Sequence, residues 1–355
     1  GRTAGSGYSG HPRMLRQPPS RLRPVRTPQA GSAPRPLVPS PESRYADGVK
    51  HAFIMDPLER VKAYKDTSYF LMLAAEQRGH EVFYLNAVDL ALDHDQVMAP
   101  LQRLRVNDNA GNPFVVETVK WQALDTVDVV WIRTDPPVDR SYIYTTLLLD
   151  LLPEHIRVVN RPSTIRDWNE KLAALRYPDW TPRTLVTRDN GRIRAFTEKF
   201  PRVTIKPIDG HGGTGIIFVT ATDSDFDAKL NEATRRGRHW VIVQEYLKAA
   251  RDGDKRILLL DGQPLGAILR LHADGVELNN LDQGGTAVAS SLTDRDRAIC
   301  QALSNDLRVH GVVFAGIDVI GGMLIEVNIT SPTGLQEMTR FDGRPYHEEI
   351  IASLE

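Results

Sequence analysis

The sequence predicts an α/β protein in which a doubly wound parallel sheet is followed by two α+β lobes. A strand–helix–strand order opens the part of the chain with regular apolar patterning, over residues 51–55, 67–78 and 81–85. Beyond residue 162, short β-rich runs alternate with glycines and helical patches. That second pattern is typical of α+β lobes rather than of further doubly wound sheet.

The apolar run at residues 51–55 predicts the first strand, and Asp56-Pro57 predicts its exit loop. A helical pattern from about Thr67 to Arg78 ends at Gly79, and residues 81–85 predict the second strand. Two strands in this order with a helix between them are expected to be parallel, with a right-handed crossover.

Residues 127–133 repeat the strand pattern and end in the polar stretch 134–137. Open α/β sheets bind ligands in the loops at the carboxyl ends of their strands. We therefore expect Asp56, Arg133 and Asp135 to meet at one edge of the sheet and to contact a substrate.

The change of pattern predicts three ordered parts. We expect a substrate domain over residues 48–162, a central lobe over residues 163–248 and a C-terminal lobe over residues 249–355. Ser163 is predicted to cap a helix that continues to about Leu175.

Composition favours a soluble multidomain enzyme. The chain has 355 residues, of which 41% are hydrophobic, and no stretch approaches the run of about eighteen apolar residues that a membrane-spanning helix needs. The single cysteine, Cys300, lies in an apolar-periodic helical pattern and is expected to be a buried, unreactive thiol. One cysteine without a disulfide partner fits the reducing cytoplasm.

Charge is distributed unevenly along the chain. Residues 1–50 contain nine Lys and Arg against Glu42 and Asp47, a net charge of +7, so the remaining residues carry −8 of the overall −1. The main body has no basic excess, which argues against nucleic acid as its partner. The Pro- and Arg-rich residues 1–47 are expected to be disordered. They could be a solvated tail or an upstream extension of the reading frame, and the alternatives are a targeting segment or a nucleic-acid-binding arm.

The most informative segment runs from Lys206 through Gly210, Gly212, Gly213 and Gly215. It matches G-x-G-x-x-G, but strand-forming residues 216–219 follow the glycines where a dinucleotide-binding fold needs a helix. A strand, a glycine loop and a second strand instead predict a hairpin flap whose bare amides bind phosphates, beside the charge of the lysine. The alternative is a long hairpin turn with a solvent-facing lysine.

A second hairpin is predicted over residues 317–328, with Asp318, Glu326 and Asn328 near its far ends. A three-residue loop would place Asp318 opposite Glu326, and a two-residue loop would not. Two buried carboxylates that face each other repel, and a hard cation such as Mg²⁺ removes this difficulty. The alternative is the solvent-exposed polar face of an ordinary hairpin.

Arg256 and Arg270 flank the predicted turn Asp261-Gly262. As a pair on adjacent strands they could clamp a carboxylate or a phosphoryl group in transfer. Residues 330–334 would add hydroxyls and an amide-rich turn beside the expected metal. No signature of a covalent enzyme nucleophile occurs in the sequence.

The succession of motifs resembles that of prokaryotic glutathione synthetases, which are ATP-grasp ligases. The motifs that carry the resemblance are, in chain order, Met55-Asp56-Pro57, Lys65-Asp66-Thr67-Ser68, Arg78-Gly79-His80-Glu81, Asp135-Pro136-Pro137, Asn169-Glu170-Lys171-Leu172, the Lys206-Pro207 strand with its glycine flap, Gln244-Glu245-Tyr246-Leu247, Asp252-Gly253-Asp254-Lys255-Arg256, the hairpin with Asp318, Glu326 and Asn328, and Thr330-Ser331-Pro332-Thr333-Gly334. They cover nearly all of the chain from His51 onward.

The resemblance implies an ATP-grasp fold, in which two α+β lobes grip ATP, preceded by a pre-ATP-grasp domain. It implies that the carboxylate of γ-glutamylcysteine attacks the γ-phosphate of ATP, and that glycine captures the acyl phosphate with release of ADP and phosphate. The family's metal is Mg²⁺, with Mn²⁺ as an alternative. A cytoplasmic homo-oligomer is expected, with small-molecule substrates and no membrane partner.

The resemblance also assigns roles to residues. Those expected to bind ATP are Lys171, Lys206, Gly210, Gly212, Gly213, Gly215, Gln244, Glu245, Tyr246, Leu247 and Asp254. Those expected to hold two metal ions are Asp318, Glu326 and Asn328. Those expected to act on the reacting carboxylate are Arg256 and Arg270. Those expected to bind the substrates are Asp56, Ser68, Arg133, Asp135, Arg270, Ser331, Thr333 and Gly334.

Two positions depart from the family pattern. Leu278 stands where many members have an arginine, and Thr134 where many have a lysine. Both changes remove positive charge from the region expected to hold the peptide. A ligase for another acid and amine therefore stays open, as does a nucleotide-binding protein without catalysis that contacts nucleic acid through its basic arm.

Overall fold

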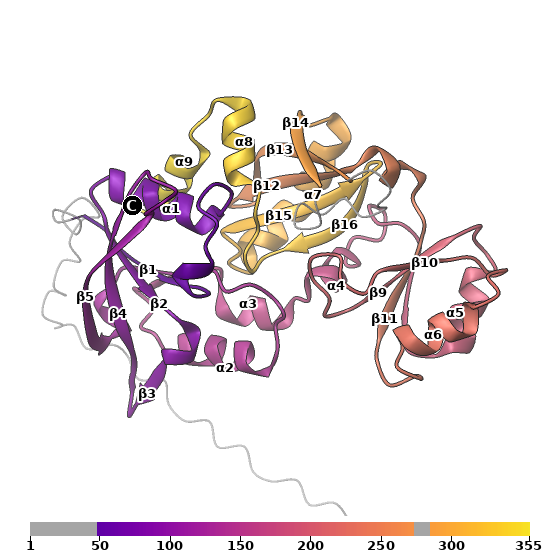
Figure 1. The fold of residues 1–355 in the computed structure, drawn as a ribbon, viewed down its shortest axis with the longest axis horizontal. Helices are drawn as coiled ribbons and strands as arrows, with labels where there is room; N and C mark the ends of the chain where they lie inside the picture. The colour runs from indigo at the N-terminus through magenta and orange to yellow at the C-terminus, as the bar shows by residue number, and fades with distance from the viewer. Residues whose placement is uncertain (1–47, 273–284) are drawn as a thin grey trace, which may run out of the picture. The chain divides into compact units, whose positions relative to one another are not determined.

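Three β-sheets organise residues 48–272 and 285–355, which are the residues that the computed structural model describes (Figure 1). The expected tail at residues 1–47 and the departure at Leu278 lie outside the described residues. The first sheet contains β1 (Lys50–Ile54), β2 (Glu81–Leu85), β3 (Ala91–Asp93), β4 (Gln96–Val106), β5 (Phe114–Ala123), β6 (Val129–Ile132) and β7 (Arg157–Val159). Its strand order is β3-β4-β2-β1-β6-β7, with β5 paired to β4.

The parallel part of this sheet confirms the strand–helix–strand prediction. Strand β1 pairs in parallel with both β2 and β6, and β6 pairs in parallel with β7. The antiparallel edge formed by β3, β4 and β5 was not predicted. Helix α1 (Thr67–Gln77) packs with Phe53 on one face, while α2 (Arg140–Leu149) and α3 (Pro162–Asp167) pack with Ile54 on the other, as a doubly wound sheet requires.

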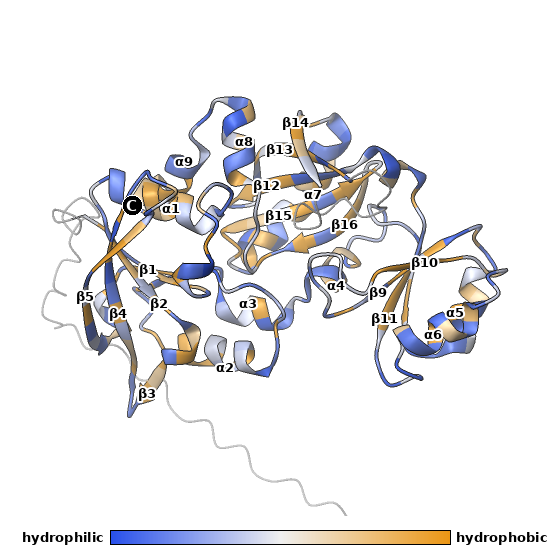
Figure 2. Cartoon of the chain, viewed as in Figure 1, coloured by the Kyte–Doolittle hydropathy of each residue, from blue (hydrophilic) through white to orange (hydrophobic). Residues whose placement is uncertain are grey.

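The second sheet is antiparallel, and its strands lie within the range 163–248 that was expected for the central lobe. It contains β8 (Thr184–Thr187), β9 (Val203–Pro207), β10 (Ile217–Val219) and β11 (Val241–Glu245) in the order β10-β9-β11-β8. Helices α5 (Asn190–Thr197) and α6 (Phe226–Ala233) pack on it through a small apolar core. Figure 2 shows these strands as largely hydrophobic and the helices as polar on much of their surface.

The third sheet is also antiparallel, with the order β14-β13-β12-β15-β16. Its strands are β12 (Asp254–Leu260), β13 (Gln263–Leu271), β14 (Thr286–Ser290), β15 (Phe314–Ile320) and β16 (Met323–Asn328). Helices α7 (Asp294–Val309), α8 (Leu335–Asp342) and α9 (Tyr346–Ala352) accompany it, and α9 packs on α1 of the first part. Short 3-10 helices lie at Leu58–Arg60, Ala87–Asp89, Leu124–Thr126 and Lys248–Asp252.

Helix α7 carries the single cysteine. A capping box between Thr293 and Asp296 begins the helix, and Cys300 is 1% exposed on its buried face. Burial raises the pKa of the Cys300 thiol to about 12. The prediction of a buried thiol is confirmed, and the raised pKa makes it a poor nucleophile.

The prediction of one continuous helix after Ser163 is wrong. Helix α3 begins with Pro162, whose fixed φ suits the first helical position, and it ends before the extended residue Trp168. A second helix, α4 (Glu170–Ala174), starts anew because the Asn169 side chain accepts hydrogen bonds from the first free backbone N–H groups. This break places Lys171 on the first turn of α4.

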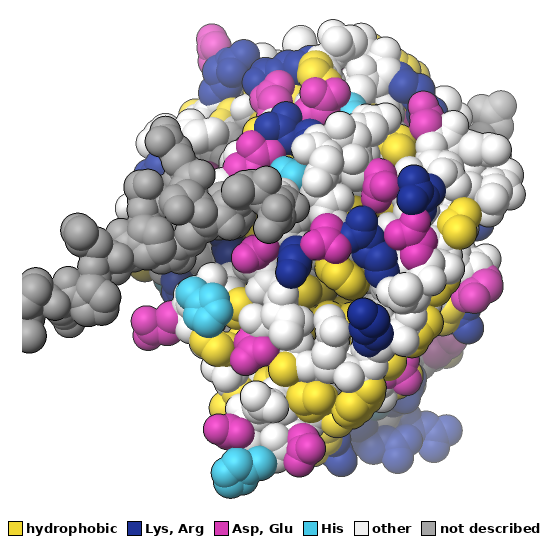
Figure 3. Space-filling model, turned by 90° about the vertical axis from the view of Figure 1, so that its left-hand side faces the viewer, with side chains coloured by type: hydrophobic (Ala, Val, Ile, Leu, Met, Phe, Trp, Pro, Cys, Tyr) yellow, Lys and Arg dark blue, Asp and Glu magenta, His cyan; other side chains and the backbone are white. Residues whose placement is uncertain are grey.

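None of the helices in the described parts of the chain is both long and apolar enough to cross a membrane. The face that carries β4 and β5 shows Lys and Arg side chains interspersed with Asp and Glu (Figure 3). Arg105 binds Glu117 across these strands, and Arg103 binds Glu81 on the neighbouring strand. The positive charge of the two β4 arginines is thus balanced locally.

Candidate active site

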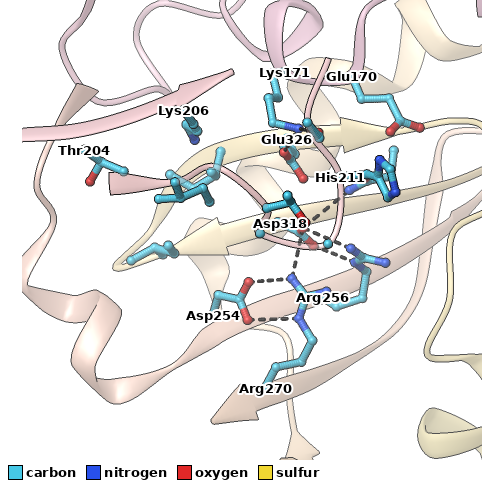
Figure 4. Close-up of a pocket in the computed structure, with 18 of the residues that line it drawn as sticks. Glu170, Lys171, Thr204, Lys206, His211, Asp254, Arg256, Arg270, Asp318 and Glu326 are labelled. Carbon is cyan, nitrogen blue, oxygen red and sulfur yellow. Dashed lines mark hydrogen bonds and ion pairs between the residues drawn. The ribbon is translucent and has the colours of Figure 1, made fainter. Parts of the chain in front are cut away.

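A cavity of about 350 Å³ lies between the glycine hairpin, α4 and the third sheet (Figure 4). Most of the predicted site residues line it: Lys171, Lys206, Gly210, Gly212, Gly213, Gln244, Glu245, Tyr246, Leu247, Asp254, Arg256, Arg270, Asp318, Glu326, Asn328, Asp135, Ser331 and Thr333. Residues more than 190 positions apart in the sequence are therefore brought to one site, which no local pattern could have shown.

The glycine hairpin has the predicted form of two antiparallel strands, with Ile205 opposite Ile217. Gly212 and Gly213 have φ values of 60° and 78°, which side-chain-bearing residues rarely adopt. A Cβ atom on Gly210 would lie 2.6 Å from Cγ of Pro207. Gly215 does not line the cavity but packs against the same proline, with φ +77°. The glycines thus permit a tight loop whose backbone can approach a ligand closely.

Two lysines approach the cavity from the lobe that carries this hairpin. Nζ of Lys171 lies 2.8 Å from Oε1 of Glu326 and also donates to the backbone oxygen of Gly210. Burial lowers the pKa of Lys206 to about 8, against the raising effect of Glu326 and with a further lowering by Lys171. The Lys206 ammonium makes no hydrogen bond or ion pair with any residue that the structure describes. A phosphate group would supply the missing counter-charge.

Two arginines converge on one carboxylate on the opposite wall. Nε and Nη2 of Arg256 donate to Oδ1 and Oδ2 of Asp318 at 2.5 and 2.9 Å, and Nη2 of Arg270 lies 2.9 Å from Oδ2. Burial alone would raise the pKa of Asp318, but the two guanidiniums outweigh it and hold this pKa well below its usual range. Strand register explains the contact, because Arg256 lies directly opposite Asp318 on β12 and β15.

Asp254, which was expected near the nucleotide, lines the cavity and binds the second arginine. Both Arg270 Nε and Nη2 donate to its carboxylate, and the two residues face each other across β12 and β13. Burial raises the pKa of Asp254, an effect that Asp318 reinforces and Arg270 opposes. Two carboxylates and two guanidiniums therefore form one buried, charge-balanced cluster, drawn with dashed lines in Figure 4.

The predicted metal ligands share one face of the β15–β16 hairpin. Asp318 lies opposite Glu326, and Asn328 Nδ2 is 3.4 Å from Oδ2 of Asp318. Within residues 48–272 and 285–355, no group of three or more His, Cys, Asp and Glu could hold a metal by itself. Two carboxylates with one amide oxygen fit a hard divalent cation whose remaining ligands are water and nucleotide phosphates.

The stretch Gln244–Leu247 lies along the cavity wall at the end of β11, whose last two residues are Gln244 and Glu245. Nε2 of Gln244 donates to Thr184 at 2.9 Å, and Glu245 accepts a hydrogen bond from the backbone N–H of Arg183. The rings of Phe218 and Tyr246 meet edge to face, with centroids 5.6 Å apart. This end of the cavity combines backbone polar groups with aromatic and apolar side chains, which suits a flat base.

Three more of the predicted substrate residues line a second cavity, of about 520 Å³, at the carboxyl ends of β1 and β6. Asp56, Ser68 and Arg133 lie only in its wall, while Asp135 and Thr333 line both cavities. The backbone N–H of Asp135 donates to Asp56 at 3.0 Å, so the predicted meeting of these loops is confirmed.

Gly334 lines neither cavity among the residues that the structure describes. It has φ +105° at the start of α8, and a Cβ atom there would lie 3.0 Å from Cδ1 of Ile268 and 3.7 Å from Cγ of Arg256. Its expected contact with substrate stays a prediction. The glycine instead lets the chain turn closely beside Arg256.

Sequence reasoning missed Glu170, whose side chain lies on the cavity wall. Its Oε1 atom accepts from the backbone N–H of Ile329 at 2.8 Å, and from the backbone N–H and the hydroxyl of Thr330 at 3.0 and 2.9 Å. Burial raises its pKa. Glu170 fixes α4 to the end of β16 and so positions Lys171. It had been named from the sequence only as part of the motif Asn169-Glu170-Lys171-Leu172. His211, at the tip of the glycine loop, was also missed (Figure 4).

Comparison with known proteins identifies the family. The family model described as prokaryotic glutathione synthetase, N-terminal domain, matches residues 49–166, and the one described as prokaryotic glutathione synthetase, ATP-grasp domain, matches residues 170–343. Glutathione synthetase of Thermosynechococcus vestitus is 40% identical over 313 residues, which cover 85% of this chain and 98% of that protein. The chain belongs to the prokaryotic glutathione synthetase family. A second member, from Gloeobacter violaceus, is 41% identical over 309 residues, or 85% of this chain and 95% of that one.

Solved structures confirm the ATP-grasp fold that the glutathione synthetase family implies. D-cycloserine synthetase DcsG aligns with a TM-score of 0.61 at 17% identity and covers 86% of this chain and 100% of its own. A RimK domain protein of Sphaerobacter thermophilus aligns with a TM-score of 0.57 at 18% identity, over 86% of this chain and 98% of its own. At these identities the likeness concerns the fold alone.

Proposed function

We propose that this chain joins γ-glutamylcysteine and glycine in an ATP-dependent reaction that releases ADP and phosphate. The supporting observation is that two pairs of cationic side chains line opposite sides of one cavity. Lys171 and Lys206 stand on one side and Arg256 and Arg270 on the other, with the carboxylates of the β15–β16 hairpin between them. Membership of the glutathione synthetase family supports the choice of substrates.

The reaction needs activation of a carboxylate, because oxide is a poor leaving group. In the first step, an oxygen of the substrate carboxylate attacks the γ-phosphorus of ATP, and the bond from that phosphorus to the bridging oxygen breaks. ADP leaves and an acyl phosphate remains. In the second step, the amine of glycine attacks the acyl carbon, phosphate leaves with the bonding electron pair, and the amine loses a proton.

Like charge is the main obstacle to the first step, since both reactants are anions. Lys206 and the amides of the glycine loop would bind the phosphates, and the Arg256–Arg270 pair would hold the carboxylate in line with them. Asp318, Glu326 and Asn328 would hold a divalent cation, Mg²⁺ or Mn²⁺. Such an ion offsets the negative charge of the phosphates when bound.

Water must be excluded, because it would hydrolyse the acyl phosphate. The glycine hairpin lines the cavity. Lys171 on α4 connects it to the third sheet, because its ammonium binds both the backbone oxygen of Gly210 and the carboxylate of Glu326 on β16. We infer that this loop closes over bound nucleotide. We also propose a cytoplasmic location, in line with the single buried thiol, and a homo-oligomeric state, in line with the family resemblance.

A substrate panel tests the function. Purified protein with ATP and Mg²⁺ should release ADP only when γ-glutamylcysteine and glycine are both present, and the tripeptide should appear in equal amount. Mn²⁺ in place of Mg²⁺ tests the metal. ADP release with other acids or amines, and none with this pair, would overturn the substrate assignment while keeping the ligase class.

A further inference from the structure

The second step of the proposed reaction needs a group that accepts a proton. The amine of free glycine is protonated at neutral pH, and in that form its nitrogen has no electron pair with which to attack the acyl carbon. A side chain on the cavity wall that accepts this proton would act as a general base. The titratable side chains between the glycine hairpin and the third sheet differ in whether they are available for this task.

Each carboxylate that lines this cavity, among the residues that the structure describes, already has a partner. The partner is an arginine, a lysine or a hydrogen-bond donor of the protein. These residues are Asp135, Glu170, Glu245, Asp254, Asp318 and Glu326. A carboxylate whose charge is stabilised in this way is a weak proton acceptor. Lys206 is expected to bind phosphate as an ammonium, which has no free electron pair.

The imidazole of His211 is available. The residue lines the cavity from the tip of the glycine loop, and it is exposed. Its imidazole makes no hydrogen bond or ion pair with any residue that the structure describes. Histidine gains and loses a proton near neutral pH, which suits a general base.

Contacts of the preceding residue tie His211 to the third sheet. The backbone oxygen of Gly210 accepts a hydrogen bond from Nζ of Lys171 at 2.5 Å. The same ammonium lies 2.8 Å from Oε1 of Glu326 on β16. The tip of the glycine loop is thereby connected to the sheet that carries Arg256.

A turn within the loop fixes the backbone of His211. Its backbone oxygen accepts from the N–H of Thr214 at 3.1 Å. Figure 4 shows the imidazole on the side of the cavity where Arg256 lies, away from Lys206. Arg256 is proposed to hold the reacting carboxylate, and Lys206 the phosphates. The imidazole therefore stands on the side where the acyl carbon and the attacking amine would meet.

We propose that His211 is the general base that deprotonates glycine before it attacks the acyl phosphate. This inference rests on the proposed function. An imidazole nitrogen accepts one proton from the ammonium, and the freed electron pair of the amine then bonds to the acyl carbon. As the carbon–oxygen bond to phosphate breaks, phosphate leaves with the electron pair and takes the second proton that the new amide nitrogen loses. The imidazolium returns its proton to water.

The first test compares two amines in the variant His211→Gln, with γ-glutamylcysteine, ATP and Mg²⁺ present. Glycine needs the base, so kcat with glycine should fall about 100-fold, the lower end of the usual contribution of a general base. Hydroxylamine is already neutral near neutral pH, so the rate at which it captures the acyl phosphate as a hydroxamate should not change. That rate also reports whether the first step is intact. An equal loss with both amines, or no loss with glycine, would overturn the inference.

The variant His239→Gln is the matched control. It changes an exposed histidine in the same range of residues, 163–248, and outside both cavities. Neither rate should change in this variant. Failure of the proposed function looks different, since the unaltered protein would then release no ADP with γ-glutamylcysteine and glycine.

Chemical rescue distinguishes a base from a residue that only shapes the loop. His211→Ala removes the imidazole, and free imidazole added to this variant should restore turnover with glycine in proportion to its concentration. The affinity of His211→Ala for a non-hydrolysable ATP analogue should equal that of the unaltered protein. No rescue would overturn the inference, and a weaker affinity for the analogue would then identify His211 as a nucleotide contact.

Discussion

Asp318 lies directly opposite Glu326 across the β15–β16 hairpin, although only Gly321 and Gly322 connect the two strands. A regular two-residue turn would place Ile325 opposite Asp318. An irregularity in the ladder between Asp318 and Val319 inserts Ile325 and shifts the pairing by one residue. The two carboxylates are thereby aligned beside Lys171, Arg256 and Arg270, which offset their mutual repulsion.

Replacing Asp318 with Asn should abolish turnover and destabilise the protein. The change removes an expected metal ligand. Among the described residues it leaves Arg270 paired with Asp254 alone and Arg256 without a carboxylate partner. Breaking a buried ion pair at one partner costs on the order of 3 kcal/mol. ADP release and urea unfolding measure the two effects. Asp179→Asn, an exposed aspartate outside both cavities, is the matched control. Normal turnover in Asp318→Asn would refute its place in the metal site.

Nucleotide affinity should fall above pH 8. The pKa of Lys206 is lowered to about 8, so its ammonium is present below this pH and is lost above it, whereas an ordinary lysine stays charged to about pH 10.4. The affinity for a non-hydrolysable ATP analogue should be level up to about pH 7.5. Above pH 8 it should decrease by at most about tenfold per pH unit. Calorimetric titration at several pH values would measure this.

The variant Lys206→Arg tests whether deprotonation of Lys206 causes the fall in nucleotide affinity above pH 8. A guanidinium remains charged throughout the range, so the decrease above pH 8 should disappear even if the affinity itself is lower. The neighbouring Lys171 should not titrate there, because its contact with Glu326 outweighs burial and raises its pKa. An unchanged pH profile in Lys206→Arg would show that another group is responsible.

Local sequence patterns predicted the parallel strands and the glycine hairpin because each depends on neighbouring residues. The strand at residues 81–85 and the helix that begins at Thr67 were predicted at their observed starts. The antiparallel edge of the first sheet was not predicted, because residues such as Val115 and Val119 on β5 are exposed and give no buried face. The β-bulge at Ile325 was also invisible, since its apolar neighbours suit either register.

Site residues were predicted where a motif marks them and missed where only tertiary contact does. Glu170 binds Thr330, which is 160 residues away, and no local pattern distinguishes it from a surface acid. Ser163 appeared to be a helix cap, but Pro162 already fixes the start of α3 and Asn169 begins the next helix. The contacts of Asp254 with Arg270 depend on the pairing of β12 with β13, which sequence alone does not reveal.

Stability should depend on pH through a buried histidine pair in the first sheet. Trp131 Nε1 donates to His51 Nδ1 at 3.1 Å, so His51 carries its proton on Nε2 and donates to Nδ1 of His80 at 3.0 Å. Burial, with a smaller effect of His80, lowers the pKa of His51 from 6.5 to about 3. Between about pH 3 and pH 6.5, the unfolded chain therefore binds a proton at His51 that the folded chain does not. Stability should be full above pH 6.5 and decrease below it by up to about 1.4 kcal/mol per pH unit.

Urea unfolding at pH 7.5, 6 and 5 would measure this dependence. His51→Gln should weaken it, while His155→Gln, an exposed histidine, should leave it unchanged. A slope in His51→Gln equal to that of the unaltered protein would assign the effect to other groups. His80, whose pKa is lowered mainly by burial, should add to the same trend.

Replacing Asn160 should destabilise the protein, because its side chain connects the first and third sheets. Its Nδ2 group donates to the backbone oxygens of Phe314 and Ile329, both at 2.7 Å, and its Oδ1 atom accepts from the N–H groups of Val313 and Phe314. The side chain thereby ties the end of β7 to the start of β15 and to the residue after β16. Those two strands carry the expected metal ligands.

Asn160→Asp provides the sharpest test of this connection. Aspartate keeps the size of the side chain and both accepting contacts, but it places an anionic oxygen against the two carbonyl oxygens that the amide had bound. The free energy of unfolding should fall by more than about 3 kcal/mol, because two buried carbonyls lose their donor and a charge is buried without a partner. Asn160→Ala removes all four contacts without adding a charge and should cost less than the aspartate. If urea unfolding gave Asn160→Asp the smaller loss, the amide donor would not be what holds the hairpin to the first sheet.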